Sequence, residues 1–182
     1  MSKAFCMDIL DWDEFPNYDI IWCDPPWEQK MVNYFETMMQ KNGYKKPNNY
    51  IDKIIEHLAK LSCINKPIFI EYSVKGYFRV LDIMIKHKHS HFETIYSKQE
   101  NGKPYVILVF NYFGTLPDGN MHGFKIIDSL CSILNFTTIF DPFAGLGKTA
   151  KKFISNNKNY IGSEINPHRF IKLKKAIWDA QQ

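Results

Sequence analysis

A short apolar run near the start of the chain ends in a sequence that no strand can continue through. Residues 19–23, Asp-Ile-Ile-Trp-Cys, predict a buried strand, and Asp24-Pro25-Pro26-Trp27 follows directly. Because proline has no N–H to donate to a sheet, the strand must stop there. The chain thus places a carboxylate at the carboxyl end of a strand, followed by a rigid turn and an aromatic side chain that we expect to be exposed. In an open α/β sheet, ligands bind at this end of the strands.

The same four residues supply groups that could hold a planar molecule carrying an amino group. The Asp24 carboxylate and a fixed backbone carbonyl are two hydrogen-bond acceptors, and Trp27 offers a flat ring for stacking. An ordinary turn with a surface tryptophan is the alternative interpretation, because Asp-Pro turns are common. The motif by itself leaves both interpretations open.

A second strand, expected at 137–140, also ends in an aspartate. It is rich in β-branched and aromatic residues, and Asp-Pro-Phe-Ala-Gly-Leu-Gly follows at 141–147. Gly145 and Gly147 allow positive φ and a close approach of the backbone to a ligand. The helix expected from Gly147 onward favours a carboxylate or phosphate at its N-terminus.

The sequence Gly147-Lys148-Thr149 superficially resembles the phosphate loop of nucleoside triphosphatases. That motif needs a glycine five positions before Gly147, and Pro142 stands there. We therefore reject a nucleoside triphosphatase.

A third strand, at 159–163, is followed by Glu164 and then by the start of a helix. An acidic side chain at the end of the second strand of a nucleotide-binding βαβ unit typically binds ribose hydroxyls. The separation of Asp141 and Glu164 is close to the ~20 residues expected in such a unit. A solvated glutamate in a turn is the alternative.

Taken together, these motifs resemble those of the S-adenosylmethionine (AdoMet)-dependent amino-methyltransferases of nucleic acids. That family carries an Asp-Pro-Pro-(Tyr/Trp/Phe) catalytic motif and an Asp-Pro-Phe-Ala-Gly-x-Gly cofactor motif, to which residues 24–27 and 141–147 are similar. The catalytic motif comes first, as in the family's circularly permuted order, and residues 162–167 are similar to its ribose-binding strand. The resemblance implies an α/β fold: one Rossmann-like methyltransferase domain over residues 1–182, with no separate target-recognition domain.

The resemblance also implies the residues of the site. Permuted members begin with the sheet's third strand, whose small-Asp pair approaches the adenine of the cofactor; here Asp8 stands at that place, with Met7 where glycine is usual. An ordinary exposed aspartate is the alternative for Asp8. The implied catalytic residues are Asp24, Pro25, Pro26 and Trp27. The implied cofactor-binding residues, with no metal, are Asp8, Asp141, Pro142, Phe143, Ala144, Gly145, Gly147, Thr149, Glu164 and Asn166.

The implied reaction is methyl transfer from AdoMet to N6 of an adenine flipped out of DNA, since family members with Asp at the first motif position mostly act on adenine. RNA adenine-N6 methylation is one alternative, and a non-catalytic subunit that binds DNA or a partner is another. Relatives that recognise a defined sequence often carry a large insert between the strand expected at 105–112 and the helix expected at 123–134. This chain has only about ten residues there. We expect a short or relaxed target, or recognition supplied by a partner chain or homodimer.

Composition agrees with a single globular domain of 182 residues, 45% hydrophobic and 23% charged. No run reaches the ~18 apolar residues that span a membrane, and no signal-peptide pattern begins the chain, so we expect a cytoplasmic protein. A net charge of +4 permits nucleic-acid binding without requiring it. The cysteines show no pair spacing and are expected to be reduced core residues: Cys6, Cys23, Cys63 and Cys131.

Strands and helices alternate along the chain, which favours a mostly parallel sheet with helices on both faces. Asn101-Gly102, in the link 98–104, predicts a hairpin and therefore an antiparallel edge. The expected elements are strands 4–8, 19–23, 67–72, 91–97, 105–112, 137–140 and 159–163, and helices 49–62, 76–87, 123–134, 147–156 and 168–179.

Residues 28–50 form a long polar segment that we expect to lack regular structure and to act as a flap over the substrate, with a surface loop as the alternative. Its basic and aromatic residues are Lys30, Tyr34, Phe35, Lys41, Tyr44, Lys45 and Lys46. Two other clusters are expected to face solvent without a chemical role. They are the histidines His87, His89 and His91 and the lysines Lys172, Lys174 and Lys175.

Overall fold

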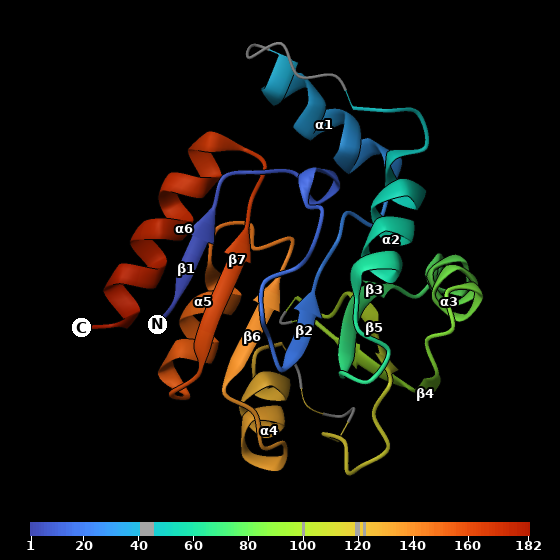
Figure 1. Ribbon diagram of the computed structural model, residues 1–182, viewed down its shortest axis with the longest axis vertical. Helices are drawn as coiled ribbons and strands as arrows, with labels where there is room; N and C mark the ends of the chain where they lie inside the picture. Colours follow the sequence, from blue (N-terminus) through green and yellow to red (C-terminus); the bar gives the residue numbers. More distant parts are fainter. Residues whose placement is uncertain (41–45, 100, 119–120, 122) are drawn as a thin grey trace.

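The computed structural model describes residues 1–40, 46–99, 101–118, 121 and 123–182, and within them the chain forms one seven-stranded sheet. The strand order is β1-β7-β6-β2-β3-β5-β4 (Figure 1). Neighbouring strands from β1 to β3 are parallel, whereas β5 is antiparallel to both β3 and β4. The strands are β1 (Lys3–Phe5), β2 (Ile20–Cys23), β3 (Ile68–Ser73), β4 (His91–Lys98), β5 (Pro104–Phe110), β6 (Thr138–Asp141) and β7 (Asn159–Ser163). The helices are η1 (Ile9–Asp11, 3-10), α1 (Gln29–Gln40), α2 (Tyr50–Leu61), α3 (Tyr77–Lys86), α4 (Lys125–Ile133), α5 (Lys148–Ser155) and α6 (Pro167–Ala180).

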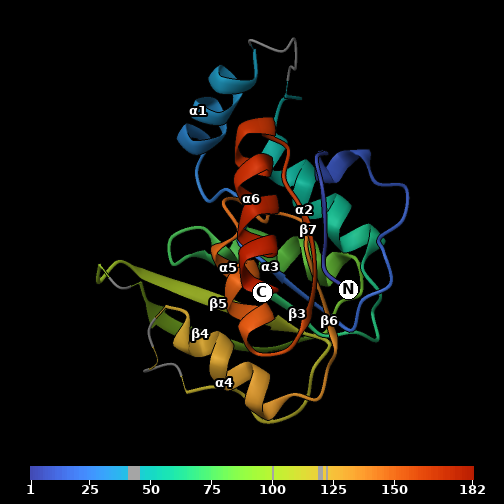
Figure 2. The same cartoon turned by 90° about the vertical axis from the view of Figure 1, so that its left-hand side faces the viewer.

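Helices cover both faces of the sheet: α4, α5 and α6 lie on one face, and α2 and α3 lie on the other (Figures 1 and 2). The central strands are buried on both sides, as their continuous apolar sequences predict. On the α5 side, Trp22 of β2 stacks on Phe69 of β3 with 6.0 Å between ring centroids, and it meets Phe153 of α5 edge-on. This packing fixes which residues of β2 and β3 share the face toward α5.

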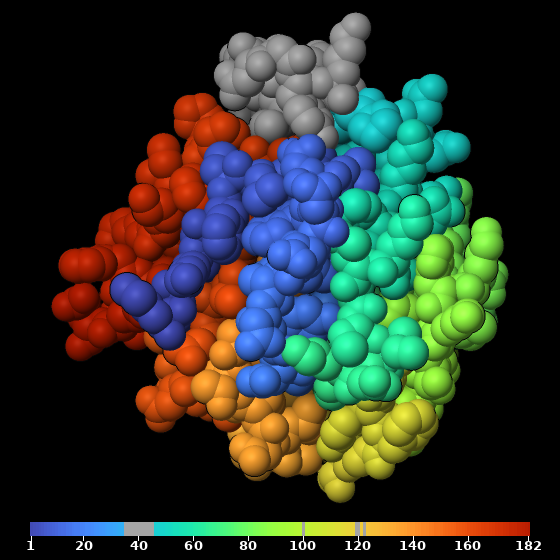
Figure 3. Space-filling model, in the orientation of Figure 1, coloured from blue at the N-terminus to red at the C-terminus, as the bar shows by residue number. Residues whose placement is uncertain are grey.

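The N-terminal segment runs across the surface between α6 and α2 (Figure 3). Strand β1 pairs with β7, but it ends at Phe5, so the expected strand 4–8 is too long. Asp8 instead caps η1, accepting a hydrogen bond from the Leu10 N–H at 3.2 Å, and it also accepts one from the Tyr50 hydroxyl of α2 at 2.9 Å. The alternative of an exposed Asp8 is wrong, because these bonds hold the side chain in a buried position.

The predicted α/β fold with an antiparallel edge hairpin is confirmed. The expectation that 28–50 lacks regular structure is wrong, because residues 29–40 form α1. Apolar residues of this segment do recur at helical spacing, at Met31, Val32, Phe35, Met38 and Met39, and the sequence interpretation did not use this signal. Lys41, Tyr44 and Lys45 lie outside the described residues.

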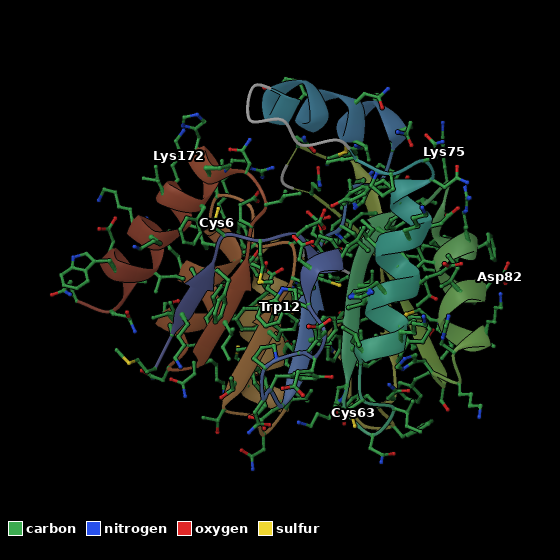
Figure 4. All side chains as sticks on the ribbon, turned by 45° about the horizontal axis from the view of Figure 1, so that its top comes forward. Cys6, Trp12, Cys63, Lys75, Asp82 and Lys172 are labelled. Atoms are coloured by element: carbon green, nitrogen blue, oxygen red, sulfur yellow. The ribbon has the colours of Figure 1, made fainter. Side chains whose placement is uncertain are left out.

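Two expectations about single side chains also need correction. Cys23 is buried, but Cys6 and Cys63 are exposed and so are not core residues (Figure 4). His89 is buried rather than solvent-facing: its ring nitrogens lie 2.8 Å from the Ala59 carbonyl oxygen and 2.9 Å from the Asn111 side-chain nitrogen. The lysines of α6 do face solvent, as expected, with Lys172 on the outer side of the helix (Figure 4). Among the described helices, none has the length and apolar character needed to cross a membrane.

Candidate active site

A cavity of about 570 Å³ opens at the carboxyl ends of β6 and β2. From β6 the chain continues to β7 on one side of the sheet, and from β2 it continues to β3 on the other. The cavity therefore lies at the topological switch point, where open α/β sheets bind their ligands. We call the part lined by Asp141–Gly145 and Glu164 the β6–α5 end, and the part lined by Asp24, Glu71 and Tyr105 the β2–β3 end.

At the β6–α5 end, a buried aspartate organises the loop that follows β6. The two carboxylate oxygens of Asp141 accept hydrogen bonds from the Phe143 N–H (3.0 Å) and the Tyr160 hydroxyl (2.7 Å). Burial raises the pKa of Asp141 to about 7, although both hydrogen bonds oppose the shift. The loop turns through Gly145, whose φ of +58° is a conformation that glycine adopts without strain.

Glu164 stands across from this loop, directly after β7. Its Oε1 accepts a hydrogen bond from the Asn166 N–H at 2.8 Å, and its Oε2 lies 3.8 Å from Nε of Arg169. Burial raises the pKa of Glu164, while the Arg169 charge and the N–H groups of Asn166 and Gly145 oppose the shift. Arg169 also lines the cavity, and the sequence interpretation missed it.

At the β2–β3 end, Asp24 presents its side chain to the cavity. The residue is exposed at the cavity mouth, but the protein around its carboxyl group displaces water, and this desolvation raises its pKa to about 7. The Trp27 indole N–H and the charges of Arg169 and Lys103 oppose the shift. Asp24 is thus an acceptor that can also take up a proton near neutral pH.

Trp27 is not exposed as we expected: its side chain is 9% exposed. The indole N–H donates to the Glu71 carbonyl oxygen of β3 at 3.3 Å, and the Tyr72 hydroxyl donates to the Trp27 carbonyl oxygen at 3.4 Å. The Lys103 ammonium lies 4.8 Å from the centroid of the Trp27 ring. These contacts tie the turn after Asp24 to β3 and cover the ring.

The structure brings most of the predicted site residues to the cavity wall. Those that line it are Asp8, Asp24, Pro26, Asp141, Pro142, Phe143, Ala144, Gly145, Thr149 and Glu164. Pro25, Trp27, Gly147 and Asn166 are described but lie outside the lining. Gly147 is needed for packing, because a Cβ there would lie 2.7 Å from the Ala176 Cβ of α6. The Asn166 side chain caps α6, accepting from the His168 and Arg169 N–H groups.

The segment 28–50 also reaches the cavity, through Met31, Lys46 and Tyr50. Glu71 and Tyr105, from β3 and β5, complete the β2–β3 end. The sequence carried a signal for Glu71 that we did not use, because it is a lone charge within the apolar strand Ile-Phe-Ile-Glu-Tyr-Ser. A charged residue in a central strand is unusual unless it faces a cavity or a partner.

Comparisons with known proteins agree with this architecture. No protein-family model and no curated protein matches the chain. Solved structures do match over nearly the whole length. M1.HpyAVI in complex with SAM is 16% identical, with a TM-score of 0.72, covering 97% of this chain and 100% of that one. PvuII DNA methyltransferase, described as cytosine-N4-specific, is 12% identical, with a TM-score of 0.71, covering 96% and 86%.

A third match is TTHA0409 from Thermus thermophilus complexed with S-adenosyl-L-methionine, which is 11% identical with a TM-score of 0.67, covering 99% and 96%. At these identities the likeness concerns the fold. The chain therefore has the single-domain methyltransferase fold that its sequence predicted.

Proposed function

We propose that the chain is an AdoMet-dependent methyltransferase that transfers a methyl group to N6 of an adenine in DNA. The observation that carries this proposal is the shared cavity, which brings Asp24 at the end of β2 together with the Gly145 turn and Glu164. The fold supports it, because matched structures contain S-adenosyl-L-methionine and one is a DNA methyltransferase. We choose adenine over cytosine as the substrate base solely because family members with an aspartate at the position of Asp24 mostly act on adenine.

The lining of the cavity suits AdoMet, because its carboxyl groups can accept hydrogen bonds from the ribose hydroxyls and amino group of the cofactor. Carboxyl groups outnumber cationic side chains in the lining, which has Asp8, Asp24, Glu71, Asp141 and Glu164 against Lys46, Lys148 and Arg169. In the proposed arrangement Glu164 binds the ribose hydroxyls and Asp8 approaches the adenine of the cofactor. Phe143, Gly145 and Thr149 form the wall beside it, and Asn166 and Gly147 act by holding the adjacent helices.

The exocyclic nitrogen of adenine is a poor nucleophile, because its lone pair is delocalised into the ring. Asp24, by accepting one N–H bond, would draw that nitrogen toward tetrahedral geometry and aim its lone pair into the cavity. For the second N–H, the family resemblance implies the carbonyl of Pro25, which adjoins Asp24 but lies outside the lining. AdoMet, when bound, supplies an electrophilic methyl group. The methylated nitrogen must then lose a proton, which Asp24 can accept because its pKa is about 7. Catalysis then rests mainly on positioning.

A base can reach this cavity only after it leaves the double helix. Met31 and Lys46 on one side, and Gln99 and Asn101 of the hairpin link on the other, line the cavity and could contact the nucleic acid. The interval between β5 and α4 covers only residues 111–124, so few side chains are free to recognise bases. We therefore propose a short or relaxed target, or a partner chain or homodimer that supplies recognition, in a single-domain cytoplasmic enzyme.

A transfer assay with tritiated AdoMet on DNA, RNA and protein tests the function, followed by identification of the methylated nucleoside. We expect label in DNA as N6-methyladenine, lost in an Asp24→Ala variant. Detection of N4-methylcytosine instead would mean that the enzyme is cytosine-N4-specific, as PvuII methyltransferase is described. Label in RNA would favour the RNA methyltransferase alternative. AdoMet binding without transfer to any of the three would support a non-catalytic subunit.

A further inference from the structure

Glu71 occupies a place beside Asp24 for which the proposed reaction has so far no use. Parallel strands β2 and β3 pair Trp22 with Phe69 and Cys23 with Ile70, so the next step of this register places Asp24 beside Glu71. Alternate residues of a strand share a face, and the stacked rings of Trp22 and Phe69 mark that face. Asp24 and Glu71 therefore project side by side into the cavity that both of them line.

The surroundings of Glu71 favour its neutral, protonated form. Within the described part of the chain, no hydrogen bond to its carboxyl group is found. The charged or titratable groups around it are Asp24, Asp141, the Cys23 thiol and the Tyr105 hydroxyl. Burial and the neighbouring carboxylates Asp24 and Asp141 raise the pKa of Glu71 to about 8. Two adjacent carboxyl groups rarely ionise together, so this one keeps a proton at neutral pH and can donate it in a hydrogen bond.

Adenine and cytosine differ from guanine and thymine on the Watson–Crick edge, which an enzyme can read once a base is flipped out. Adenine has the acceptor N1 next to its C6 amine, and cytosine has the acceptor N3 next to its C4 amine. Guanine and thymine carry an N–H at the corresponding position. A donor beside the acceptor that holds the amine would therefore match adenine or cytosine and oppose the other two bases.

We propose that Glu71, as a neutral carboxylic acid, donates a hydrogen bond to the ring nitrogen next to the methylated amine, N1 of adenine, and so selects the base. This inference rests on the proposed function. Each carboxyl group then binds one polar group on the edge of the base: Asp24 accepts a hydrogen bond from the amine, and Glu71 donates one to the ring nitrogen. Trp27 is a positioning residue for this pair, because its indole N–H bonds to the Glu71 carbonyl oxygen from the turn that follows Asp24.

The test combines variants of Glu71 with substrates that lack one ring nitrogen. Wild type, Glu71→Ala and Glu71→Gln would be assayed on one oligonucleotide with adenine, 1-deazaadenine or 7-deazaadenine at the target. Glu93→Gln, an exposed glutamate on β4 outside the cavity, is the matched control. Calorimetry of AdoMet binding checks that each variant keeps a folded site.

On adenine, we expect Glu71→Ala to lower kcat/KM about 10- to 100-fold, as loss of one hydrogen bond in a desolvated site allows. Glu71→Gln keeps a donor and should stay within a few-fold of wild type. On 1-deazaadenine, wild type and Glu71→Ala should be equally slow, because the bond is already absent. On 7-deazaadenine, the penalty for Glu71→Ala should remain.

Three results would overturn the proposal. If Glu71→Ala lowers kcat/KM equally on adenine and on 1-deazaadenine, Glu71 has a purely structural role. If instead the loss disappears only with 7-deazaadenine, the contact of Glu71 is with N7 rather than with N1. A Glu71→Gln variant as slow as Glu71→Ala would show that Glu71 accepts a proton rather than donates one. Failure of wild type to methylate any oligonucleotide would instead refute the proposed function itself.

Discussion

At the β6–α5 end of the cavity, the carboxyl groups are held by several hydrogen bonds within the protein, whereas at the β2–β3 end the carboxyl groups of Asp24 and Glu71 are directed mainly into open space. Asp141 is held by Phe143 and Tyr160, and Glu164 is held by the Asn166 N–H and lies beside Arg169. Asp24 and Glu71 instead project into the cavity, and the contacts of the adjoining turn run through Trp27 to the backbone of β3.

This difference indicates two ways of building a ligand site. The β6–α5 end is made by a turn of the main chain whose shape is set before any ligand arrives. The β2–β3 end is made by side chains whose polar groups a ligand would have to satisfy. Substitutions at the first end should therefore act on cofactor affinity, and substitutions at the second on turnover and on choice of base.

The largest expected effect is that of Asp24→Ala. Loss of the carboxylate that accepts from the amine should reduce methyl transfer by more than the ~10²–10³-fold typical of one transition-state hydrogen bond, because the proton acceptor is lost as well. AdoMet affinity, measured by calorimetry, should stay within a few-fold of wild type, since the β6–α5 end is intact. Turnover near the wild-type rate would show that the chemistry lies elsewhere.

Gly145→Val should act on the other end and abolish measurable AdoMet binding. Valine resists the φ of +58°, and its Cβ would lie 2.9 Å from Nη2 of Arg169. Gly102→Val in the hairpin link is a matched control, because φ is +81° there and a Cβ would meet nothing within 4 Å. AdoMet binding that survives in Gly145→Val and fails in Gly102→Val would reverse the assignment of the two ends.

Glu164→Ala should weaken AdoMet binding less, by about 1–3 kcal/mol, the value of a hydrogen bond to a charged group. The loop around Gly145 remains, so the site should persist without its contact to the ribose. Titration calorimetry against AdoMet measures the change. Unchanged affinity would place the ribose away from Glu164.

Much of this architecture could be predicted because it depends on local rules. Strand ends marked by Asp24-Pro25 and Asp141-Pro142, and the hairpin at Asn101-Gly102, follow from proline's missing N–H and from turn preferences. Helix α1 could also have been predicted, because Met31, Phe35 and Met38 follow the i, i+4, i+7 spacing of a helix, but the many polar residues of the segment were given more weight.

Contacts between residues far apart in the sequence, by contrast, could not be predicted. The burial of Trp27 depends on Glu71, Tyr72 and Lys103, and all three lie more than forty positions further along the chain. Arg169 reaches Glu164 because α6 begins with the Asn166 cap, which a motif centred on the acidic residue does not describe. Contacts between side chains that only sheet register brings together therefore cannot be predicted from local sequence and must be read from the three-dimensional structure.

A smaller effect should appear in the pH dependence of cofactor binding. The pKa of Asp141 is about 7, raised by burial, and the carboxyl groups of Asp24, Glu164 and Glu71 lie around it. Because the carboxyl groups lose protons as the pH rises toward that value, attraction for the sulfonium cation should grow, and AdoMet affinity should increase severalfold between about pH 5.5 and about pH 7. S-Adenosylhomocysteine, whose sulfur is neutral, should show a flatter profile. Parallel profiles for the two ligands would contradict the role of these carboxyl groups.

The smallest effect should be that of Trp27→Phe, which separates two roles for the motif tryptophan. Phenylalanine keeps an aromatic ring for stacking but removes the N–H that bonds to the Glu71 carbonyl oxygen at 3.3 Å. If Trp27 acts by holding Glu71 beside Asp24, loss of this bond should lower kcat/KM on adenine by about 2- to 10-fold. The preference for adenine over 1-deazaadenine should shrink at the same time, with AdoMet affinity unchanged. If Trp27 instead stacks on the flipped base, Trp27→Phe should resemble wild type and Trp27→Ala should slow both substrates equally, because a lost stacking surface does not distinguish one ring nitrogen from a carbon.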